Sequence, residues 1–225
     1  MSISRWLAGV QKSFRQKRMR RFAASFPLNE RGRILDVGGT PEIWELLPGR
    51  QDFRVILLNM PRAEADRRTA REGPGQVSLE YVCGDGCNLP FADRSFDIVF
   101  SNSVIEHVGG EAAQSKFARE VMRSGQAYWV QTPNRYFPIE THLLTPFVHL
   151  LPRRLGAFVV RRFTIWQWIR RPDPDEKHFY IEHFISDIRL LSAGQLQLLF
   201  PDAVIFRERF LFFTKSLVAF RPPRS

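Results

Sequence analysis

The sequence predicts an α/β protein whose parallel sheet is covered by helices on both faces. Short apolar runs of strand length alternate with segments of helical periodicity over most of the chain. Glycines and polar residues follow several of these runs, as at Gly38-Gly39 and Gly84-Asp85-Gly86. Because consecutive parallel strands need crossover connections, this alternation implies right-handed crossovers and a doubly covered sheet. The chain has 225 residues, 44% of them hydrophobic, so it can bury one substantial core.

A basic amphipathic helix is expected in residues 1–26, ahead of the sheet. This segment holds seven Arg or Lys residues and no acidic residue. Its apolar residues recur at helical spacing: Ile3, Trp6, Leu7, Val10 and Phe14. The helix could dock on a membrane surface, cover an active site or pack its apolar stripe on the domain. The sequence leaves these alternatives open.

Seven strands are expected, in residues 33–37, 53–58, 77–82, 96–100, 126–131, 203–207 and 216–220. Helices are expected from Thr40 or Pro41 to residue 47, near residues 104–108 and in residues 111–122. After a polar break at residues 173–177, a helix is expected in residues 186–199 with Ser186 or Asp187 as its N-cap. Residues 27–225 are therefore expected to form one domain, with a lid or substrate-recognition insertion at about 133–185.

The turn after the first strand, Asp36-Val-Gly-Gly39, has the composition of a ligand-binding loop. Glycines let the backbone turn sharply and approach a ligand, and the helix that follows presents free N–H groups. The turn does not satisfy G-x-G-x-x-G, which argues against a dinucleotide site. Polar residues also close the second and third strands, at the sheet edge where open α/β proteins bind ligands.

Three stretches together resemble the class I S-adenosylmethionine-dependent methyltransferases, in particular their type 11 branch. They are Ile34-Leu-Asp-Val-Gly-Gly39, Asp85-Gly-Cys-Asn-Leu-Pro-Phe-Ala-Asp-Arg-Ser-Phe-Asp-Ile-Val99 and Ser101-Asn-Ser-Val-Ile-Glu-His-Val108. The resemblance implies a Rossmann-like seven-stranded fold, mostly parallel with an antiparallel last strand. It also implies a methyl-transferring enzyme with S-adenosyl-L-methionine as cofactor.

The resemblance implies cofactor contacts from Asp36, Gly38, Gly39, Asn59, Gly84, Asp85, Gly86, Ser101 and Asn102. The glycine loop and the residues after the fourth strand would face the methionine portion. Asp85 would accept from the adenine amine, and Asn59 would bind the ribose hydroxyls. The chain departs from the family at two places, because Asn59 replaces a carboxylate and Thr40-Pro41-Glu42 replaces later glycines of the loop.

Candidate catalytic residues are His107, Glu140 and His142, with His178 and His183 as further possible bases. A general base is needed when the methyl acceptor is a hydroxyl. His107 follows the fourth strand, near the expected position of the transferable methyl, although it could also be a packing or capping histidine. Glu140, His142 and His183 could share a divalent ion, but their spacing defines no site, so no metal is expected.

The net charge of +10 indicates an anionic partner, which could be a nucleic acid, a phospholipid surface or a phosphorylated substrate. The apolar, arginine-rich residues 143–171 favour an amphipathic acceptor, either a small molecule or a glycan or lipid-linked compound methylated on oxygen. An RNA methyltransferase is the closest alternative. It is disfavoured because Ser101-Asn-Ser-Val replaces the Asn/Asp-Pro-Pro-aromatic arrangement and no cysteine follows the fourth or fifth strand. A non-catalytic, methyltransferase-like binding protein is the other alternative.

A cytoplasmic location is expected, with peripheral contact to the inner face of the membrane through the basic helix. The apolar stretches are interrupted before they reach the roughly twenty residues that a membrane span needs. The two cysteines, Cys83 and Cys87, are too few for a disulfide scaffold and fit a reducing compartment.

Overall fold

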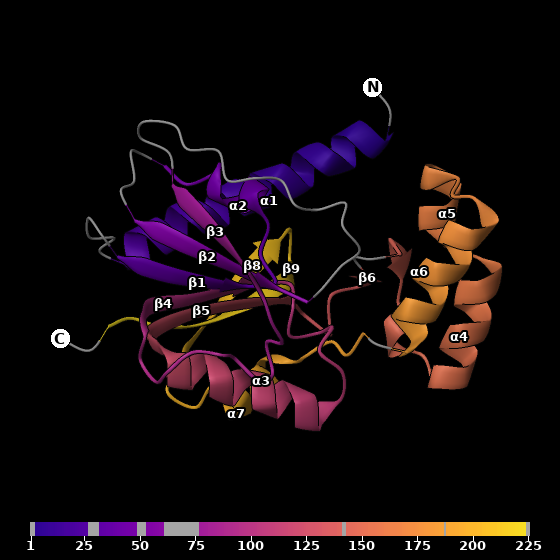
Figure 1. Cartoon of the computed structure of the whole chain (residues 1–225). Helices are drawn as coiled ribbons and strands as arrows, with labels where there is room; N and C mark the ends of the chain where they lie inside the picture. The colour runs from indigo at the N-terminus through magenta and orange to yellow at the C-terminus, as the bar shows by residue number, and fades with distance from the viewer. Residues whose placement is uncertain are drawn as a thin grey trace.

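A seven-stranded sheet forms the centre of the protein, in the order β3-β2-β1-β4-β5-β9-β8 (Figure 1). The computed structural model describes residues 3–26, 32–48, 53–60, 77–140, 143–186 and 188–223. The strands are β1 (Arg33–Val37), β2 (Arg54–Asn59), β3 (Ser78–Cys83), β4 (Phe96–Asn102), β5 (Gly125–Pro133), β8 (Val204–Phe210) and β9 (Phe213–Arg221). The pairs among β1 to β5 are parallel, and only β9, the last strand, runs antiparallel to its neighbours β5 and β8. The expected Rossmann-like fold class is confirmed.

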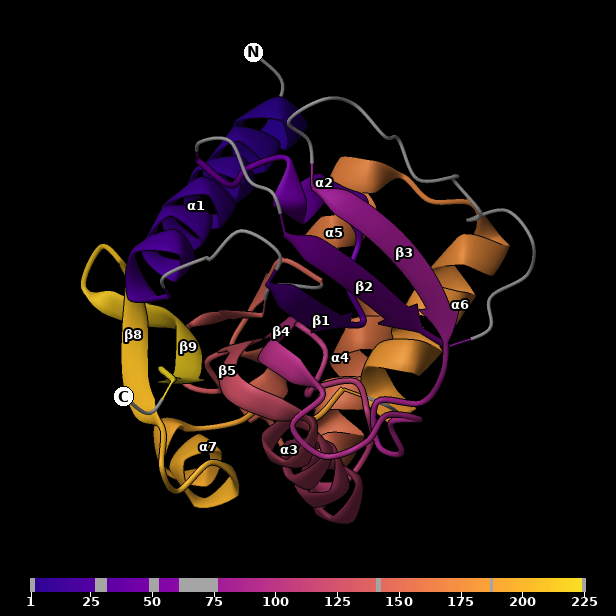
Figure 2. The same ribbon diagram turned by 60° about the vertical axis from the view of Figure 1, so that its left-hand side comes forward.

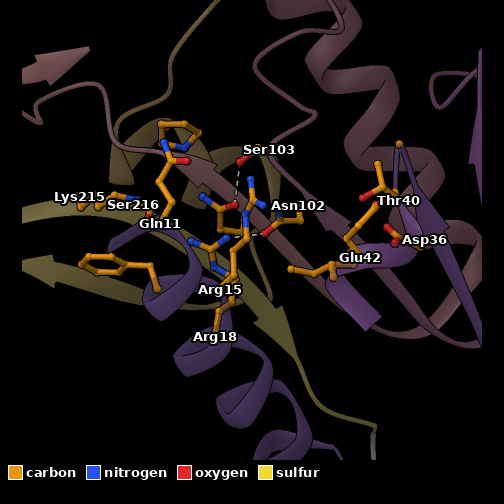
Figure 3. A pocket seen from close by; sticks show the side chains of 16 residues that line it. Gln11, Arg15, Arg18, Asp36, Thr40, Glu42, Asn102, Ser103, Lys215 and Ser216 are labelled. Carbon is orange, nitrogen blue, oxygen red and sulfur yellow. Dashed lines mark hydrogen bonds between the residues drawn. The ribbon is translucent and has the colours of Figure 1, made fainter. Parts of the chain in front are cut away.

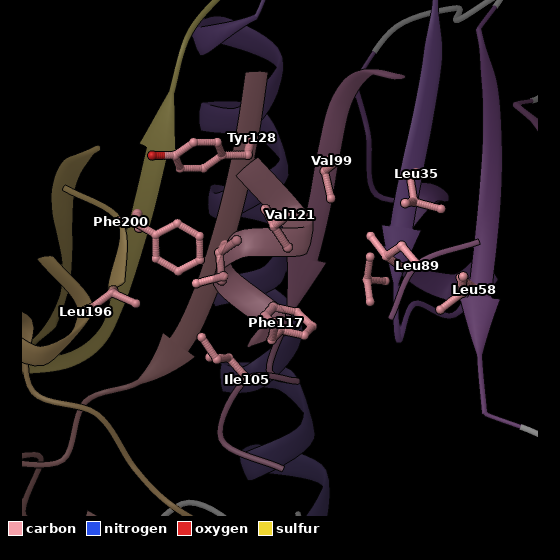
Figure 4. Packing of buried hydrophobic residues seen from close by; sticks show 14 of the residues in the cluster. Leu35, Leu58, Leu89, Val99, Ile105, Phe117, Val121, Tyr128, Leu196 and Phe200 are labelled. Carbon is pink, nitrogen blue, oxygen red and sulfur yellow. The ribbon is translucent and has the colours of Figure 1, made fainter. Parts of the chain in front are cut away.

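Helices cover both faces of the sheet, and each face has its own apolar core (Figure 1). On one face, α1 (Ile3–Ser25) and α2 (Pro41–Trp44) cover a cluster rich in aromatic rings. On the other face, α3 (Glu111–Ser124) and α7 (Ala193–Leu199) cover an aliphatic cluster that also holds Phe117, Tyr128 and Phe200 (Figure 4). Alternate residues of the buried strands supply the two clusters, because successive side chains of a strand point to opposite faces.

The C-terminal half of α1 is an integral part of the fold. Met19, Phe22 and Phe26 are almost completely buried against the sheet. The Phe22 ring lies 5.1 to 5.9 Å, centroid to centroid, from the rings of Phe26, Trp44, Phe100 and Trp129. Three of these four contacts are edge-to-face, the arrangement that the aromatic quadrupole favours.

A buried ion pair also joins α1 to the far edge of the sheet. Both oxygens of Glu208, in β8, accept hydrogen bonds from the Arg18 guanidinium, at 2.9 and 2.5 Å. Ser216 donates a further hydrogen bond to Glu208. Burial alone would raise the pKa of Glu208, but the hydrogen bonds from Arg18 outweigh it and hold this pKa below its ordinary value. The pair therefore fixes the position of α1 along β8.

The segment between β5 and α7 forms a separate helical layer at the carboxyl ends of the strands (Figure 1). It contains the β6–β7 pair (Ile139–Glu140 with Thr145–Pro146), a 3₁₀ turn (Val148–Leu150), α4 (Arg153–Arg162), α5 (Ile165–Arg170) and α6 (Pro174–Ser186). Its buried apolar residues form their own cluster: Leu143, Val148, Val160, Trp166 and Ile181. This layer lies within the range expected for an insertion.

Two sequence expectations in this region are wrong. Residues 186–199 do not form one helix, since α6 ends at Ser186 and α7 begins only after Ser192. Ser192 is the N-cap of α7, and it exchanges hydrogen bonds with Gln195 in a capping box. Of the two predicted N-caps, Ser186 is the last residue of α6 and Asp187 lies outside the described residues.

The polar stretch at residues 173–177 starts α6 rather than breaking the chain. The carboxylate of Asp173 accepts a hydrogen bond from the backbone N–H of Glu176, as an N-cap does. Residues 104–108 form a turn closed by a hydrogen bond from His107 N to Val104 O, not a helix. In both places a short polar or apolar run was compatible with two local structures, and tertiary packing selected one.

Replacing Phe22 by alanine should lower the free energy of unfolding by about 3–5 kcal/mol, because it opens a cavity among four aromatic rings. Urea denaturation followed by tryptophan fluorescence measures the change. Lys17→Ala, at an exposed position of the same helix, is the matched control and should change stability by less than about 0.5 kcal/mol. Equal effects of the two substitutions would contradict the packing of α1 described here.

Candidate active site

A cavity of about 360 Å³ lies at the carboxyl ends of β1, β4 and β5, under α1 (Figure 3). One wall is the turn after β1, from Gly38 to Thr40. The floor comes from the residues that end β4 and β5. The opposite wall comes from α1 and β9, which contribute Gln11, Phe14, Arg15, Arg18, Lys215 and Ser216. Segments from the two ends of the sequence therefore complete one site.

The glycine turn is shaped by close contacts that a side chain would prevent. Gly38 has a φ of +75°, which favours glycine, and the space where its Cβ would lie is occupied by Val104. A Cβ on Gly39 would overlap the carboxylate of Asp36. The backbone N–H of Gly38 donates to the Leu58 carbonyl at 2.7 Å, which ties the turn to β2. Both glycines are thus required by geometry.

Asp36 is a completely buried carboxyl group in the wall of the cavity. Its Oδ2 accepts a hydrogen bond from the Trp44 indole at 2.8 Å, whereas Oδ1 has no hydrogen-bond partner among the described residues. Burial raises the pKa of Asp36 to about 7, against the smaller opposite effect of the Trp44 bond. A buried carboxylate oxygen of this kind fits a cationic ligand group such as an ammonium.

The residues at the ends of β2 and β3 are joined to the glycine turn by hydrogen bonds. Asn59 Nδ2 donates to the Gly39 carbonyl at 2.9 Å, and Gly84 N donates to the Asn59 carbonyl at 2.9 Å. Asp85 is exposed, and its Oδ1 accepts from Cys87 N at 2.8 Å. A Cβ on Gly86 would lie 2.8 Å from a methyl carbon of Val37, so only glycine fits there. These strand ends form a continuous polar edge.

The residues after β4 divide between structural and cavity-facing positions. Ser101 is completely buried, and its hydroxyl donates to the Val37 carbonyl at 3.0 Å. Asn102 lines the cavity, where its Oδ1 accepts from Arg18. Ser103, which the sequence analysis did not select, also lines it and donates to Gln131 at 3.0 Å (Figure 3). Ser103 has a φ of +58°, which turns the chain so that its side chain can face the cavity.

The end of the cavity between α1 and β9 is positively charged. Arg15, Arg18 and Lys215 line it, and Arg18 is bound to the buried carboxylate of Glu208. Burial, and next the charge of Arg18, lower the pKa of Lys215 to about 8. The ammonium of Lys215 also lies 4.6 Å from the centroid of the Phe14 ring. This end can therefore hold an anionic group, and Lys215 can exchange a proton near neutral pH.

The sequence could not single out these cavity residues, because α1 and β9 are almost 200 residues apart along the chain. The usable signals were weak. Arg15 and Arg18 belong to the basic run of residues 1–26, but only packing distinguishes them from the solvated cations of the same helix. Lys215 stands between Thr214 and Ser216, just before the predicted strand 216–220, and no local pattern distinguishes it.

Two of the predicted catalytic residues, His107 and Glu140, lie outside this cavity. His107 is on the turn after β4, is 28% exposed and has its Nε2 3.9 Å from the Glu106 carboxylate. Glu140 is buried in β6, where it accepts a hydrogen bond from Leu143 N at 2.6 Å. Neither is among the residues that line the cavity. His142 lies outside the described residues, as does the side chain of His183.

Within the described part of the chain, no group of three or more His, Cys, Asp or Glu residues could hold a metal ion. His178 is exposed on α6. The described helices include none that is both long enough and apolar enough to cross a membrane.

Comparisons with known proteins agree with this architecture. Residues 35–126 match the family model described as a methyltransferase domain. An uncharacterized methyltransferase of Mycobacterium sp. (strain KMS) is 38% identical over 76 residues, which cover 33% of this chain and 28% of the relative. The chain thus spans well under half the length of that relative.

Two solved structures share the fold at low sequence identity. The S-adenosylmethionine-dependent methyltransferase from Methanosarcina mazei is 14% identical, with a TM-score of 0.50 over 88% of this chain and 95% of that one. A possible exported protein from Bordetella parapertussis is 13% identical, with a TM-score of 0.55 over 94% of this chain and 67% of that one. At these identities the likeness establishes the fold alone.

Replacing Asp36 by asparagine should remove a pH dependence of stability. The pKa of Asp36 is raised on folding, so its contribution is fully present below about pH 4 and is lost as the pH rises to about 7. The loss corresponds to the order of 4 kcal/mol for a group whose pKa rises this far. Urea denaturation of the parent protein and of D36N at pH 5 and pH 8 tests this. The free energy of unfolding should differ less between the two pH values in D36N than in the parent. An unchanged difference would mean that Asp36 ionises freely in the native state.

Replacing Gly39 by alanine should destabilise the protein by about 1–3 kcal/mol, because the new methyl group overlaps the Asp36 carboxylate. Gly194→Ala, inside α7, is the matched control, since no atom lies within 4 Å of the added carbon. It should not lower stability, because alanine is a better helix former than glycine. Thermal melts of the three proteins measure both effects, and a G39A variant as stable as G194A would refute the close contact.

Proposed function

We propose that this chain, a class I S-adenosylmethionine-dependent methyltransferase by its fold and by residues 35–126, transfers a methyl group to an acceptor in the cavity under α1. The observation that carries the proposal is that the glycine turn of β1 and the end of β4 open into the same cavity as the cationic wall. The cofactor, at the glycine turn, and the acceptor, at the cationic wall, would thus bind in the same cavity.

The residues present fit the cofactor that the methyltransferase domain implies. Asp36 offers a buried carboxylate oxygen to an ammonium, and the backbone at Gly38 and Gly39 allows close approach. Asn59 and Asp85 would bind the nucleoside portion. When bound, S-adenosylmethionine supplies an electrophilic methyl group on a sulfonium. Ser101 would support the site by holding β4 to β1 rather than by contact.

The chain's own contribution would be binding, orientation and exclusion of water. α1 forms the roof of the cavity, fixed by the Arg18–Glu208 pair. Arg15 would hold an anionic group of the acceptor, such as a phosphate or a carboxylate. This supports the acceptor class inferred from the sequence: a small molecule, a glycan or a lipid-linked compound, methylated on oxygen.

A hydroxyl acceptor must lose a proton during the transfer. The general bases proposed from the sequence are His107, Glu140 and His142. Lys215 is the titratable group that the structure adds, because it lines the cavity and a substantial fraction of it would be neutral at about pH 8. It would accept the proton at Nζ.

Labelled S-adenosylmethionine incubated with the protein and a fractionated cell extract tests the proposal. Counts in a lipid, glycan or small-molecule fraction would support it, whereas counts in RNA would favour the alternative of RNA methylation. Binding of S-adenosylhomocysteine, measured by calorimetry, distinguishes these two enzyme activities from a non-catalytic protein that has lost the cofactor. Absence of binding at millimolar concentration would exclude the enzyme.

Replacing Asp85 by alanine should weaken S-adenosylhomocysteine binding at least about tenfold, since one charge-assisted hydrogen bond contributes about 1.5–3 kcal/mol. Isothermal titration calorimetry measures the dissociation constant directly. Asp175→Ala, at an exposed position of α6, is the control and should leave the affinity unchanged. Equal affinities for the parent and D85A would remove Asp85 from the cofactor site.

A further inference from the structure

The turn between β8 and β9 is exposed and apolar, and its residue types are unusual for a hairpin turn. Phe210 pairs with Phe213, so Leu211 and Phe212 form a two-residue turn. Such turns normally carry Asn, Asp or Gly. Leu211 has a φ of +52°, which is unfavourable for a bulky side chain. Leu211, Phe212 and Phe213 are 74%, 96% and 50% exposed, so burial does not offset this strain.

Cations lie on the two elements beside this tip, α1 and β8; we define the tip as residues 211–213. The middle of α1 lies against the hairpin, since the rings of Phe14 and Phe210 are 5.9 Å apart (Figure 2). Exposed Lys12, Arg15 and Lys17 flank Phe14 along α1, and exposed Arg209 precedes the tip in β8. The only acidic residue in residues 204–221 is Glu208, which is buried and bound to Arg18.

We propose that the 211–213 tip inserts into an anionic phospholipid membrane, while the cations of α1 contact the lipid head groups. Large apolar side chains next to Lys and Arg are what interfacial attachment requires. A stable protein interface needs about 800 Å² from each partner, which three residues at a hairpin tip do not supply. The charge pattern also selects an anionic surface over a neutral one.

The tip and the cavity share the same edge of the sheet. Lys215 and Ser216 follow the tip by two and three residues in β9, and both line the cavity together with Phe14. A protein bound through the tip would therefore turn this edge toward the bilayer. This last step rests on the proposed function, and it favours an acceptor that reaches the cavity from the membrane. Attachment itself does not depend on methyl transfer.

Cosedimentation with vesicles of phosphatidylcholine, with and without phosphatidylglycerol, tests the attachment on the full chain. The parent protein should bind the anionic vesicles, and binding should weaken with added salt because head-group attraction is screened. Leu211→Gly/Phe212→Asn should lower the partition coefficient at least about tenfold. Glycine suits the positive φ at residue 211, so this variant should keep the parent melting temperature.

Leu198→Gln is the matched control, since Leu198 is 82% exposed on α7, across the sheet from α1. It should bind vesicles as the parent does. Lys12→Glu/Lys17→Glu should weaken binding without changing the melting temperature. The proposal fails if the parent does not bind anionic vesicles, or if the tip variant binds as well as the parent. It also fails if the parent self-associates in solution and the tip variant is monomeric, which would make the tip an interface between copies.

Discussion

The position of α1 on the sheet is the constraint on which the rest of the site depends. Phe22 packs among four aromatic rings, and the buried pair of Arg18 with Glu208 fixes the register of the helix along β8. A buried ion pair adds little net stability compared with apolar packing, but breaking it leaves an uncompensated charge. α1 therefore has one favourable position, and in that position it roofs the cavity.

Electrostatics divide the cavity into two ends. At the glycine turn, Asp36 is buried without a full set of hydrogen bonds, which raises its pKa and makes it an acceptor for a cationic group. At the α1–β9 end, Arg15 and Lys215 favour an anion. A low local dielectric strengthens both preferences. This polarity would suit the proposed arrangement, in which a cationic cofactor and an anionic acceptor lie at opposite ends of one space.

Positive φ values occur at the glycine turn (Gly38), at the cavity floor (Ser103) and at the hairpin tip (Leu211). They also occur elsewhere among the described residues, at Arg94, Gly109, Leu144, Phe147 and Arg171. Glycine adopts this backbone without cost, whereas serine and leucine do not. Ser103 gains a hydrogen bond to Gln131, but the exposed Leu211 gains no burial. The physical reason for assigning the tip a role outside the folded protein itself is that three consecutive apolar residues, Leu211, Phe212 and Phe213, are all exposed there.

Much of the fold was determined by the sequence alone. The apolar runs, the glycine turn and the polar strand ends are local features, so their order predicted the seven strands, the doubly covered sheet and the edge near Asp36, Asn59 and Asp85. The start of α7 was missed, although Ser192 followed three residues later by Gln195 is the sequence pattern of a capping box. Only the tertiary structure showed that Ser101 is buried while Ser103 faces the cavity. It also brought Arg18 and Lys215 together, because contacts between the two ends of a chain leave no local pattern in its sequence.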